Sequence, residues 1–260
     1  MSARSTTAPR PGVNLPCRPA RALALPVLGL GLLAAAPALA VLTPLSPGAP
    51  GQPETPPPPW VYAGLPQQQP PPTRFALVPL DGRTVLRVEA ERAYGNLLHP
   101  LPGTPAGRLS WRWRVDRVLP AVDLRSKAGD DTALKVCAMF ELPRERVPFV
   151  ERQLLRLAES RLGEPLPNAT LCYVWDNSQP AGSVLPNAYS RRLRFITLGG
   201  AVGTWQAVSR DLAADFVQAF GDEAQAAPPL RAVAVGADAD NTGGHSLGFI
   251  DALRLELPAR

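Results

Sequence analysis

Cysteine is scarce in this chain of 260 residues, which has three, at positions 17, 137 and 172. No two of them form a Cys-x-x-Cys pair, so neither a cysteine-bound zinc ion nor a dithiol redox centre is indicated. Cys17 precedes the long apolar run near the N-terminus, whereas a lipoprotein acceptor would follow it. Cys137 and Cys172 lie in strand-like segments, where two interpretations stay open: a disulfide, or two small buried hydrophobic side chains.

Acidic residues are absent before Glu54, whereas four arginines, at positions 4, 10, 18 and 21, precede an apolar run over residues 22–41. The run ends in Ala38-Leu39-Ala40. This is the layout of a secretory signal peptide, so residues 1–40 are predicted to be removed by a cut after Ala40. If the leader stays uncleaved, its apolar run is long enough to span a bilayer. Either way, the rest of the chain is expected to be periplasmic or secreted.

The net charge of +5 is mostly a property of the leader. Of the 27 basic residues, four lie in the leader, which leaves 23 basic against 22 acidic residues and a formal charge of +1. A basic balance usually points to nucleic acid or an anionic membrane. We therefore expect no nucleic acid and no nucleotide as partner, and membrane contact only if the leader is uncleaved.

Proline is concentrated toward the N-terminus, with 18 of the 32 prolines in the first 72 residues. Residues 41–72 favour extended polyproline II and contain too few apolar side chains to fold alone. They are predicted to be a Pro-rich disordered linker, from which Trp60, Val61 and Tyr62 are able to pack back. Residues 73–260 follow as one domain, long enough for a sizeable core.

The domain has mostly β patterning. In residues 108–119, Leu109, Trp111 and Trp113 alternate with polar residues, the period of a strand with one buried face. Paired large aromatics of this kind, also seen at Tyr173 and Trp175, favour a core between two sheets over an open row that stacks sugars. Further strands are expected over residues 83–90, 132–142, 170–175, 191–198, 230–235 and 249–257.

Two segments have helical spacing instead. Residues 147–162 carry apolar side chains at helical intervals before Gly163, a typical helix stop. Ser209 is expected to cap a second helix that ends before Gly221; its apolar face is Leu212, Phe216 and Phe220. Many strands with two inserted helices predict a mostly β fold, an antiparallel, jelly-roll-like β-sandwich.

Three spaced motifs carry a resemblance to a known family. They are Trp111-Arg112-Trp113 through Asp130-Asp131, then Tyr173-Val174-Trp175, then Asp238-Ala239-Asp240-Asn241-Thr242-Gly243. In this order they resemble the exported bacterial proteins catalogued as domain of unknown function 3047, over residues 73–257. That family implies no established activity. The patterning of residues 75–98 is also similar to galactose-binding-like jelly rolls, which commonly hold carbohydrate; this is an analogy of fold only.

Residues 244–248 match the G-x-S-x-G pattern of lipases and esterases. That chemistry needs a strand–turn–helix around the serine and a histidine later in the chain. No histidine follows His245, and His99 lies about 150 residues upstream. A Gly-rich hairpin turn explains the segment better.

Two acidic loops offer oxygen ligands. Asp238, Asp240 and Asn241, with Thr242 behind them, suit a calcium ion, although the EF-hand spacing fails at Phe249; the alternative is a turn in which these side chains bond local amides. The second group comprises Asp123, Lys127, Asp130 and Asp131. If both loops lie at the same end of the sandwich, they make one site for an ion or for sugar hydroxyls.

The favoured function is therefore a non-catalytic module of the cell envelope that binds a carbohydrate or similar polar ligand, with no required cofactor and Ca²⁺ as an option. Trp205, which follows a Gly-Gly turn, is a further candidate contact. One alternative is a polysaccharide hydrolase that uses two carboxylates, drawn from Asp130, Asp131, Glu141, Asp176, Asp238 and Asp240. The other alternative is a purely structural envelope protein whose polar loops only shape turns.

Overall fold

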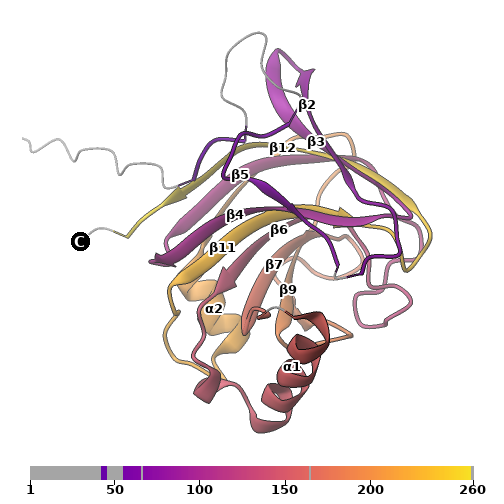
Figure 1. Cartoon of the computed structure of the whole chain (residues 1–260). Helices are drawn as coiled ribbons and strands as arrows, with labels where there is room; N and C mark the ends of the chain where they lie inside the picture. The colour runs from indigo at the N-terminus through magenta and orange to yellow at the C-terminus, as the bar shows by residue number, and fades with distance from the viewer. Residues whose placement is uncertain (1–41, 46–54, 66, 164, 259–260) are drawn as a thin grey trace, which may run out of the picture. The chain divides into compact units, whose positions relative to one another are not determined.

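The computed structural model describes residues 42–45, 55–65, 67–163 and 165–258 (Figure 1). The chain divides into two units, residues 1–37 and 38–260, and all described residues belong to the second. The predicted leader and its cleavage site therefore lie outside the described residues. Within the described part of the chain, no helix is long and apolar enough to cross a membrane.

Two β-sheets form the domain, which confirms the predicted β-sandwich with two inserted helices (Figure 1). The seven-stranded sheet has the order β1-β4-β11-β6-β7-β9-β8, and the five-stranded sheet has the order β10-β5-β12-β3-β2. Pairing is antiparallel except between β7 and β9, which run parallel. The elements are β1 (Val61–Ala63), β2 (Arg74–Leu80), β3 (Arg83–Glu91), β4 (Tyr94–Thr104), β5 (Arg108–Arg117), β6 (Thr132–Phe140), η1 (Arg144–Arg146), α1 (Phe149–Leu162), β7 (Ala169–Trp175), β8 (Val184–Pro186), β9 (Leu193–Leu198), β10 (Gln206–Asp211), α2 (Leu212–Phe220), β11 (Leu230–Asp238) and β12 (His245–Glu256).

The main core lies between the two sheets and contains the paired aromatics that alternation predicts to be buried. Trp111 of β5 contacts Trp113 edge-on, with ring centroids 5.6 Å apart, and Tyr173 of β7 across the sandwich at 5.2 Å. All three are almost completely buried. They are core residues and are not available to stack a sugar.

The two helices end where glycines predict. At Gly163 the backbone φ is 74°, the left-handed conformation that glycine adopts without strain, and its N–H bonds the Glu159 carbonyl at 2.8 Å. The cap of α2 differs from the prediction. Ser209 lies within β10, and the Asp211 carboxylate instead accepts from the amides of Ala213 and Ala214. Asp suits this position as well as Ser does.

Part of the predicted linker is not a disordered spacer. Leu42, Leu45 and Trp60 are buried in the main core, and β1 pairs with β4. Trp60 Nε1 donates to the Thr43 carbonyl at 2.9 Å, and the Thr43 N–H donates to His99 Nε2 at 3.1 Å. Trp60 and β1 match the expectation that residues 60–62 pack back. Leu42 and Leu45 differ from the expected disordered linker, because a few large apolar side chains supply enough burial to order a proline-rich segment.

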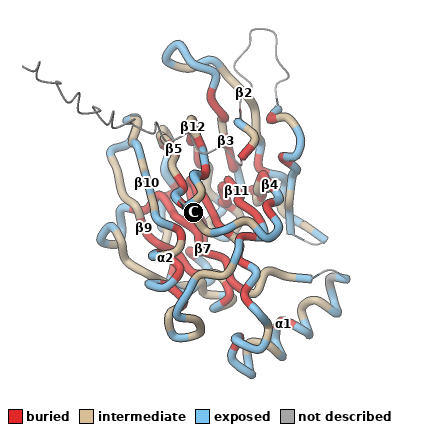
Figure 2. Tube along the Cα trace, turned by 90° about the vertical axis from the view of Figure 1, so that its left-hand side faces the viewer, coloured by how far each residue is buried: buried red, intermediate tan, exposed pale blue. Residues whose placement is uncertain are grey.

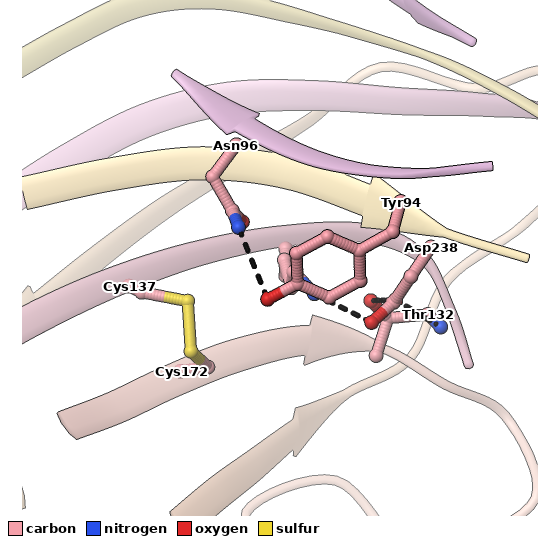
Figure 3. The surroundings of a disulfide bond; sticks show 7 residues. Tyr94, Asn96, Thr132, Cys137, Cys172 and Asp238 are labelled. Carbon is pink, nitrogen blue, oxygen red and sulfur yellow. Dashed lines mark hydrogen bonds and ion pairs between the residues drawn. A yellow bond between two sulfur atoms is a disulfide. The ribbon is translucent and has the colours of Figure 1, made fainter. Parts of the chain in front are cut away.

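Cys137 and Cys172 form a disulfide, which settles the two interpretations left open by the sequence (Figure 3). They are directly opposed in the register of β6 and β7. The bond lies in a second, smaller apolar cluster on the side of the seven-stranded sheet away from the main core, together with Leu124, Val174 and Phe195.

Candidate functional site

The two acidic loops meet because the strands beside them are neighbours. β6 and β11 are antiparallel, and Asp238, at the end of β11, is opposite Thr132, at the start of β6. The loop that precedes β6 and the loop that follows β11 therefore leave the sheet at the same edge. Both acidic loops thus lie at the same end of the sandwich, which is the condition stated above for one shared site.

Asp131 joins the two loops directly. Its Oδ2 accepts from the Thr242 amide at 2.6 Å, and its Oδ1 accepts from the Asn241 amide at 3.2 Å. Asn241 Nδ2 also donates to the Asp130 carbonyl at 3.0 Å. Since Asp131 is fully buried and both its oxygens accept amide hydrogens, it holds the loops together.

Asp238 ends β11 and lies in the surroundings of the disulfide (Figure 3). Its Oδ2 accepts from Lys135 Nζ at 2.7 Å, and its Oδ1 accepts from the Thr132 amide at 2.7 Å and from the Thr132 hydroxyl. Burial opposes the charge on Lys135, but the carboxylate of Asp238 raises its pKa above the usual range. Asp238 is thus an internal counter-ion.

The carboxylates of Asp130 and Asp240 have fewer hydrogen-bond donors around them than those of Asp131 and Asp238. Burial raises the pKa of Asp130 to about 6, and the charges of Asp238 and Asp131 add to this, although Asn187 Nδ2 donates to its Oδ2 at 2.5 Å. Burial and the charge of Asp238 also raise the pKa of Asp240. Among the described residues, Asp240 Oδ1 is buried without a hydrogen-bond partner. A group in that state has unused capacity to accept from a ligand.

Tyr189 forms the outer rim of the site and is 58% exposed. Its hydroxyl donates to Asn241 Oδ1 at 2.9 Å, and Lys127 Nζ lies 5.1 Å from its ring centroid. We call Asp130, Asp131, Asp238, Asp240, Asn241 and Tyr189 the acidic cluster. Sequence reasoning missed Tyr189, Asn187 and Lys135; only Lys135, a lone charge within an apolar strand, gave a signal.

A pocket of ≈ 310 Å³ adjoins the acidic cluster through Asp131 and Thr132. One part of its lining is polar and includes Asp176 and Ser178; the other part is apolar and includes Trp175, Val118 and Val202. The Asp176 carboxylate accepts from the Ser178 amide and hydroxyl, at 2.8 and 3.0 Å. A pocket with polar and apolar sides suits a ligand that has both hydroxyl groups and C–H faces.

Two predicted contacts lie apart from the acidic cluster. Asp123 Oδ1 accepts from the amide and side chain of Arg125 within its own turn. Trp205 Nε1 donates to Asp81 Oδ2 at 2.8 Å, and the Arg112 guanidinium lies over its ring at 5.0 Å. These contacts place Trp205 on the five-stranded sheet.

The serine of the G-x-S-x-G match lies inside a strand. Ser246 belongs to β12 and is fully buried, while the neighbouring His245 bonds Glu89 at 2.9 Å. A nucleophile elbow places its serine on an exposed strand-to-helix turn. The sequence correctly argues against a nucleophile elbow, but the hairpin turn expected for residues 244–248 is wrong, because β12 already begins at His245.

No group of three or more His, Cys, Asp or Glu side chains in the described residues is arranged to hold a metal ion. Asp238 and Asp131 already use their oxygens on Lys135, Thr132 and loop amides. Calcium at Asp238, Asp240 and Asn241 stays a prediction.

The comparisons with known proteins identify a family, but they do not identify an activity. The family model described as "Protein of unknown function (DUF3047)" matches residues 58–254. No curated protein matches the chain. Among solved structures, it is similar to endoglucanase 3 from family GH12 of Trichoderma harzianum, with 9% identity, 70% of this chain and 85% of that chain covered, and a TM-score of 0.35. It is also similar to the native family 12 xyloglucanase from Bacillus licheniformis, with 7% identity, 76% and 100% covered, and a TM-score of 0.35. Similarity at this level is too low to transfer an activity or a site.

Proposed function

We propose a function from the site itself, since the chain belongs to the DUF3047 family, whose description gives no activity. The proposed function is that of an exported envelope module that binds a carbohydrate or a similar polyhydroxylated ligand and does not transform it. The observation that carries this proposal is the meeting of both acidic loops beside the pocket of ≈ 310 Å³. Asp240, with its unpartnered oxygen, and Tyr189, with its exposed ring, are the proposed ligand contacts.

The charges of the site define the class of ligand. Four carboxylates, of Asp130, Asp131, Asp238 and Asp240, surround one buried cation, Lys135. An anionic ligand would be repelled, whereas hydroxyl groups donate hydrogen bonds to carboxylate oxygens. The Tyr189 ring gives the C–H face of a sugar a surface to pack on. A neutral glycan fits both features.

Export and the envelope location belong to the proposal. The leader-like sequence of residues 1–40 supports them. The Cys137–Cys172 disulfide also supports them, because such bonds persist mainly in oxidising compartments.

Calcium has no part in the proposed binding. Of the two carboxylates predicted to hold the ion, Asp238 is engaged by Lys135 and Thr132, which leaves Asp240 with Asn241. An ion would have to displace Lys135 from a buried ion pair.

The test is a screen of the full-length protein against neutral cell-wall and exopolysaccharide oligosaccharides. We expect a glycan that binds the wild type and loses at least tenfold in affinity with Asp240→Ala. Glu145→Gln, an exposed acidic residue of η1, is the matched control and should bind normally. If no glycan binds, the polar loops only shape turns and the structural alternative holds. If both variants bind like the wild type, the glycan binds elsewhere and Asp240 is not a ligand contact.

A hydrolase is the second candidate, because Asp130 has the elevated pKa of a general acid and lies close to other carboxylates. It predicts slow turnover of the bound glycan that Asp130→Asn abolishes without loss of binding. Product analysis after long incubation separates the two functions, since a binding module leaves the glycan intact.

A further inference from the structure

Helix α1 presents its apolar side to solvent. Phe149, Val150, Leu154 and Leu157 are 66, 67, 57 and 49% exposed. A helix with this spacing normally turns such a face toward the core. Figure 2 shows α1 at the edge of the domain, with little buried surface. The exposed apolar face of α1, made of these four residues, is therefore unpartnered among the described residues.

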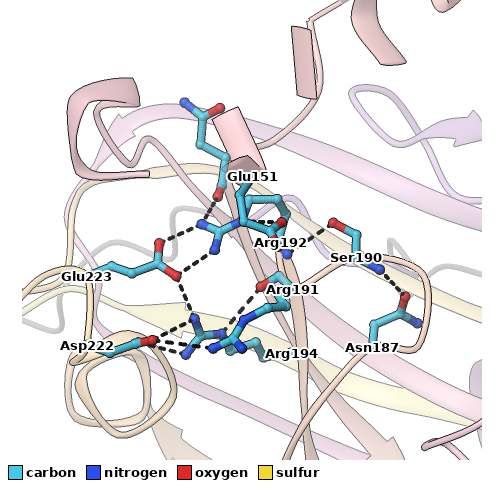
Figure 4. A network of polar contacts seen from close by, with 9 residues as sticks. Glu151, Asn187, Ser190, Arg191, Arg192, Arg194, Asp222 and Glu223 are labelled. Atoms are coloured by element: carbon cyan, nitrogen blue, oxygen red, sulfur yellow. Dashed lines mark hydrogen bonds and ion pairs between the residues drawn. The ribbon is translucent and has the colours of Figure 1, made fainter. Parts of the chain in front are cut away.

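The acidic side chains of α1 face the domain instead. Glu151 Oε2 lies 3.6 Å from Arg192 Nε (Figure 4), and Glu159 pairs with Arg144. Leu155, between them on the helix, is buried. The orientation of the helix is thus set by ion pairs and by one apolar contact.

A buried network of ion pairs opposes rotation of α1 about its own axis. Arg192 is bonded to Glu223 at 2.5 Å, and Glu223 also pairs with Arg194 at 2.6 Å (Figure 4). All three side chains are less than 10% exposed. Turning the apolar face inward would separate Glu151 from this network and leave charge unpaired. The apolar face is held outward.

The fully exposed charges on α1 are positive. Arg156 and Arg161 are exposed, and Arg152, half-buried, lies over the Phe149 ring at 5.7 Å. The acidic residues of the described helix form ion pairs with Arg144 and Arg192. Large apolar side chains with arginines beside them match the two parts of a lipid interface, the acyl boundary and the anionic headgroups.

We propose that α1 docks the protein onto an anionic lipid surface, lying in the plane of the interface. Its 14 residues are about 21 Å long, too short to span a bilayer. A second copy of the chain is a poorer occupant, because a symmetric contact would gather the positive charges of Arg156 and Arg161 from both copies in one interface. The proposal departs from the expectation that membrane contact requires an uncleaved leader, and it is independent of the acidic cluster.

The test needs a signal from α1 itself, because the apolar run of residues 22–41 is present in the full chain. Tryptophan is introduced at α1 by Leu154→Trp and, as a matched control, on α2 by Val217→Trp; Val217 is 36% exposed. Each full-length variant is mixed with vesicles of phosphatidylglycerol and phosphatidylcholine, with and without brominated acyl chains. We expect quenching of the added fluorescence in Leu154→Trp and none in Val217→Trp.

Charge substitutions complete the test. Leu154→Glu should reduce sedimentation with phosphatidylglycerol vesicles at least fivefold relative to Val217→Glu, and pure phosphatidylcholine should bind the wild type more weakly. Equal quenching at both tryptophans, or equal sedimentation of both glutamate variants, would overturn the proposal. So would a wild-type dimer that Leu154→Glu dissociates without any effect on vesicle binding, since the apolar face would then be covered by a second copy.

Discussion

Lys135 Nζ donates to Asp238 Oδ2 at 2.7 Å across the neighbouring strands β6 and β11, and both side chains are about nine-tenths buried. Removing one member of such a pair leaves an uncompensated charge in the interior. We expect Asp238→Ala to lower the free energy of unfolding by about 3–5 kcal/mol, measured by urea denaturation. A loss of this size would mean that the pair acts in stability rather than in ligand contact.

Asp240 provides the contrast on the same loop. Because its buried Oδ1 has no partner in the described residues and burial raises its pKa, the folded protein gains little from this carboxylate. Asp240→Asn should change the free energy of unfolding by less than about 0.5 kcal/mol or increase it. A large loss of stability would place Asp240 with the internal counter-ions and remove it from the proposed site.

The residues of both acidic loops could be identified from the sequence, but not their meeting. β6 and β11 are neighbours in the sheet although α1, α2 and four strands separate them along the chain. A pattern of period two identifies a strand and its buried face, whereas the choice of partner depends on long-range packing. Asn187 and Tyr189 were missed for the same reason, since they follow a short strand that has little apolar alternation.

Because of the prolines around them, strand β4 and the core residues Leu42 and Leu45 of the proline-rich segment were not predicted from the sequence. β4 contains Pro100 and Pro102, which argue against a central strand. It nevertheless pairs with β1 and β11, with a register shift opposite this segment.

Helix α1 was predicted close to its observed bounds, but its orientation depends on Glu151 and Arg192, which meet only in the folded chain.

The disulfide closes a long loop, because Cys137 and Cys172 are 35 positions apart in the sequence. Such a bond is expected to contribute about 3–4 kcal/mol by restricting the unfolded chain. Cys137→Ala, Cys172→Ala and the double variant should lose similar amounts, because each breaks the same bond. Denaturation in urea measures this, with Cys17→Ser as the control. Small, additive losses would indicate two independent thiols.

Asp130 should make stability depend on pH. Its pKa is about 6 in the folded protein, above the unfolded value of about 3.9, so the folded state holds the proton more tightly. This contribution is present below pH 4 and is lost as the pH rises through 6. Asp130→Asn should therefore be more stable than the wild type at pH 7.5, by roughly 1–2 kcal/mol, and the difference should vanish near pH 4.

Comparing Asp130→Asn with the wild type at each pH cancels the titrating groups that do not interact with Asp130. The charges of Asp238, Lys135 and Asp131 act on Asp130 directly, so the difference reports Asp130 together with these neighbours. Urea denaturation between pH 4 and 7.5 supplies the measurement. A difference that stays constant with pH would show that Asp130 keeps an ordinary pKa, and the hydrolase candidate would lose its general acid.

Calcium should leave the melting temperature unchanged. An ion at 100 times its dissociation constant would add about 2.7 kcal/mol, which is several degrees for a domain of this size. We expect no such rise, because Asp238 is bonded to Lys135 and Thr132, and Asp131 is bonded to the amides of Asn241 and Thr242. Thermal melts in EDTA and in millimolar calcium decide the point. A rise of several degrees that Asp240→Asn removes would show that the ion displaces Lys135, and the glycan site would then be calcium-dependent.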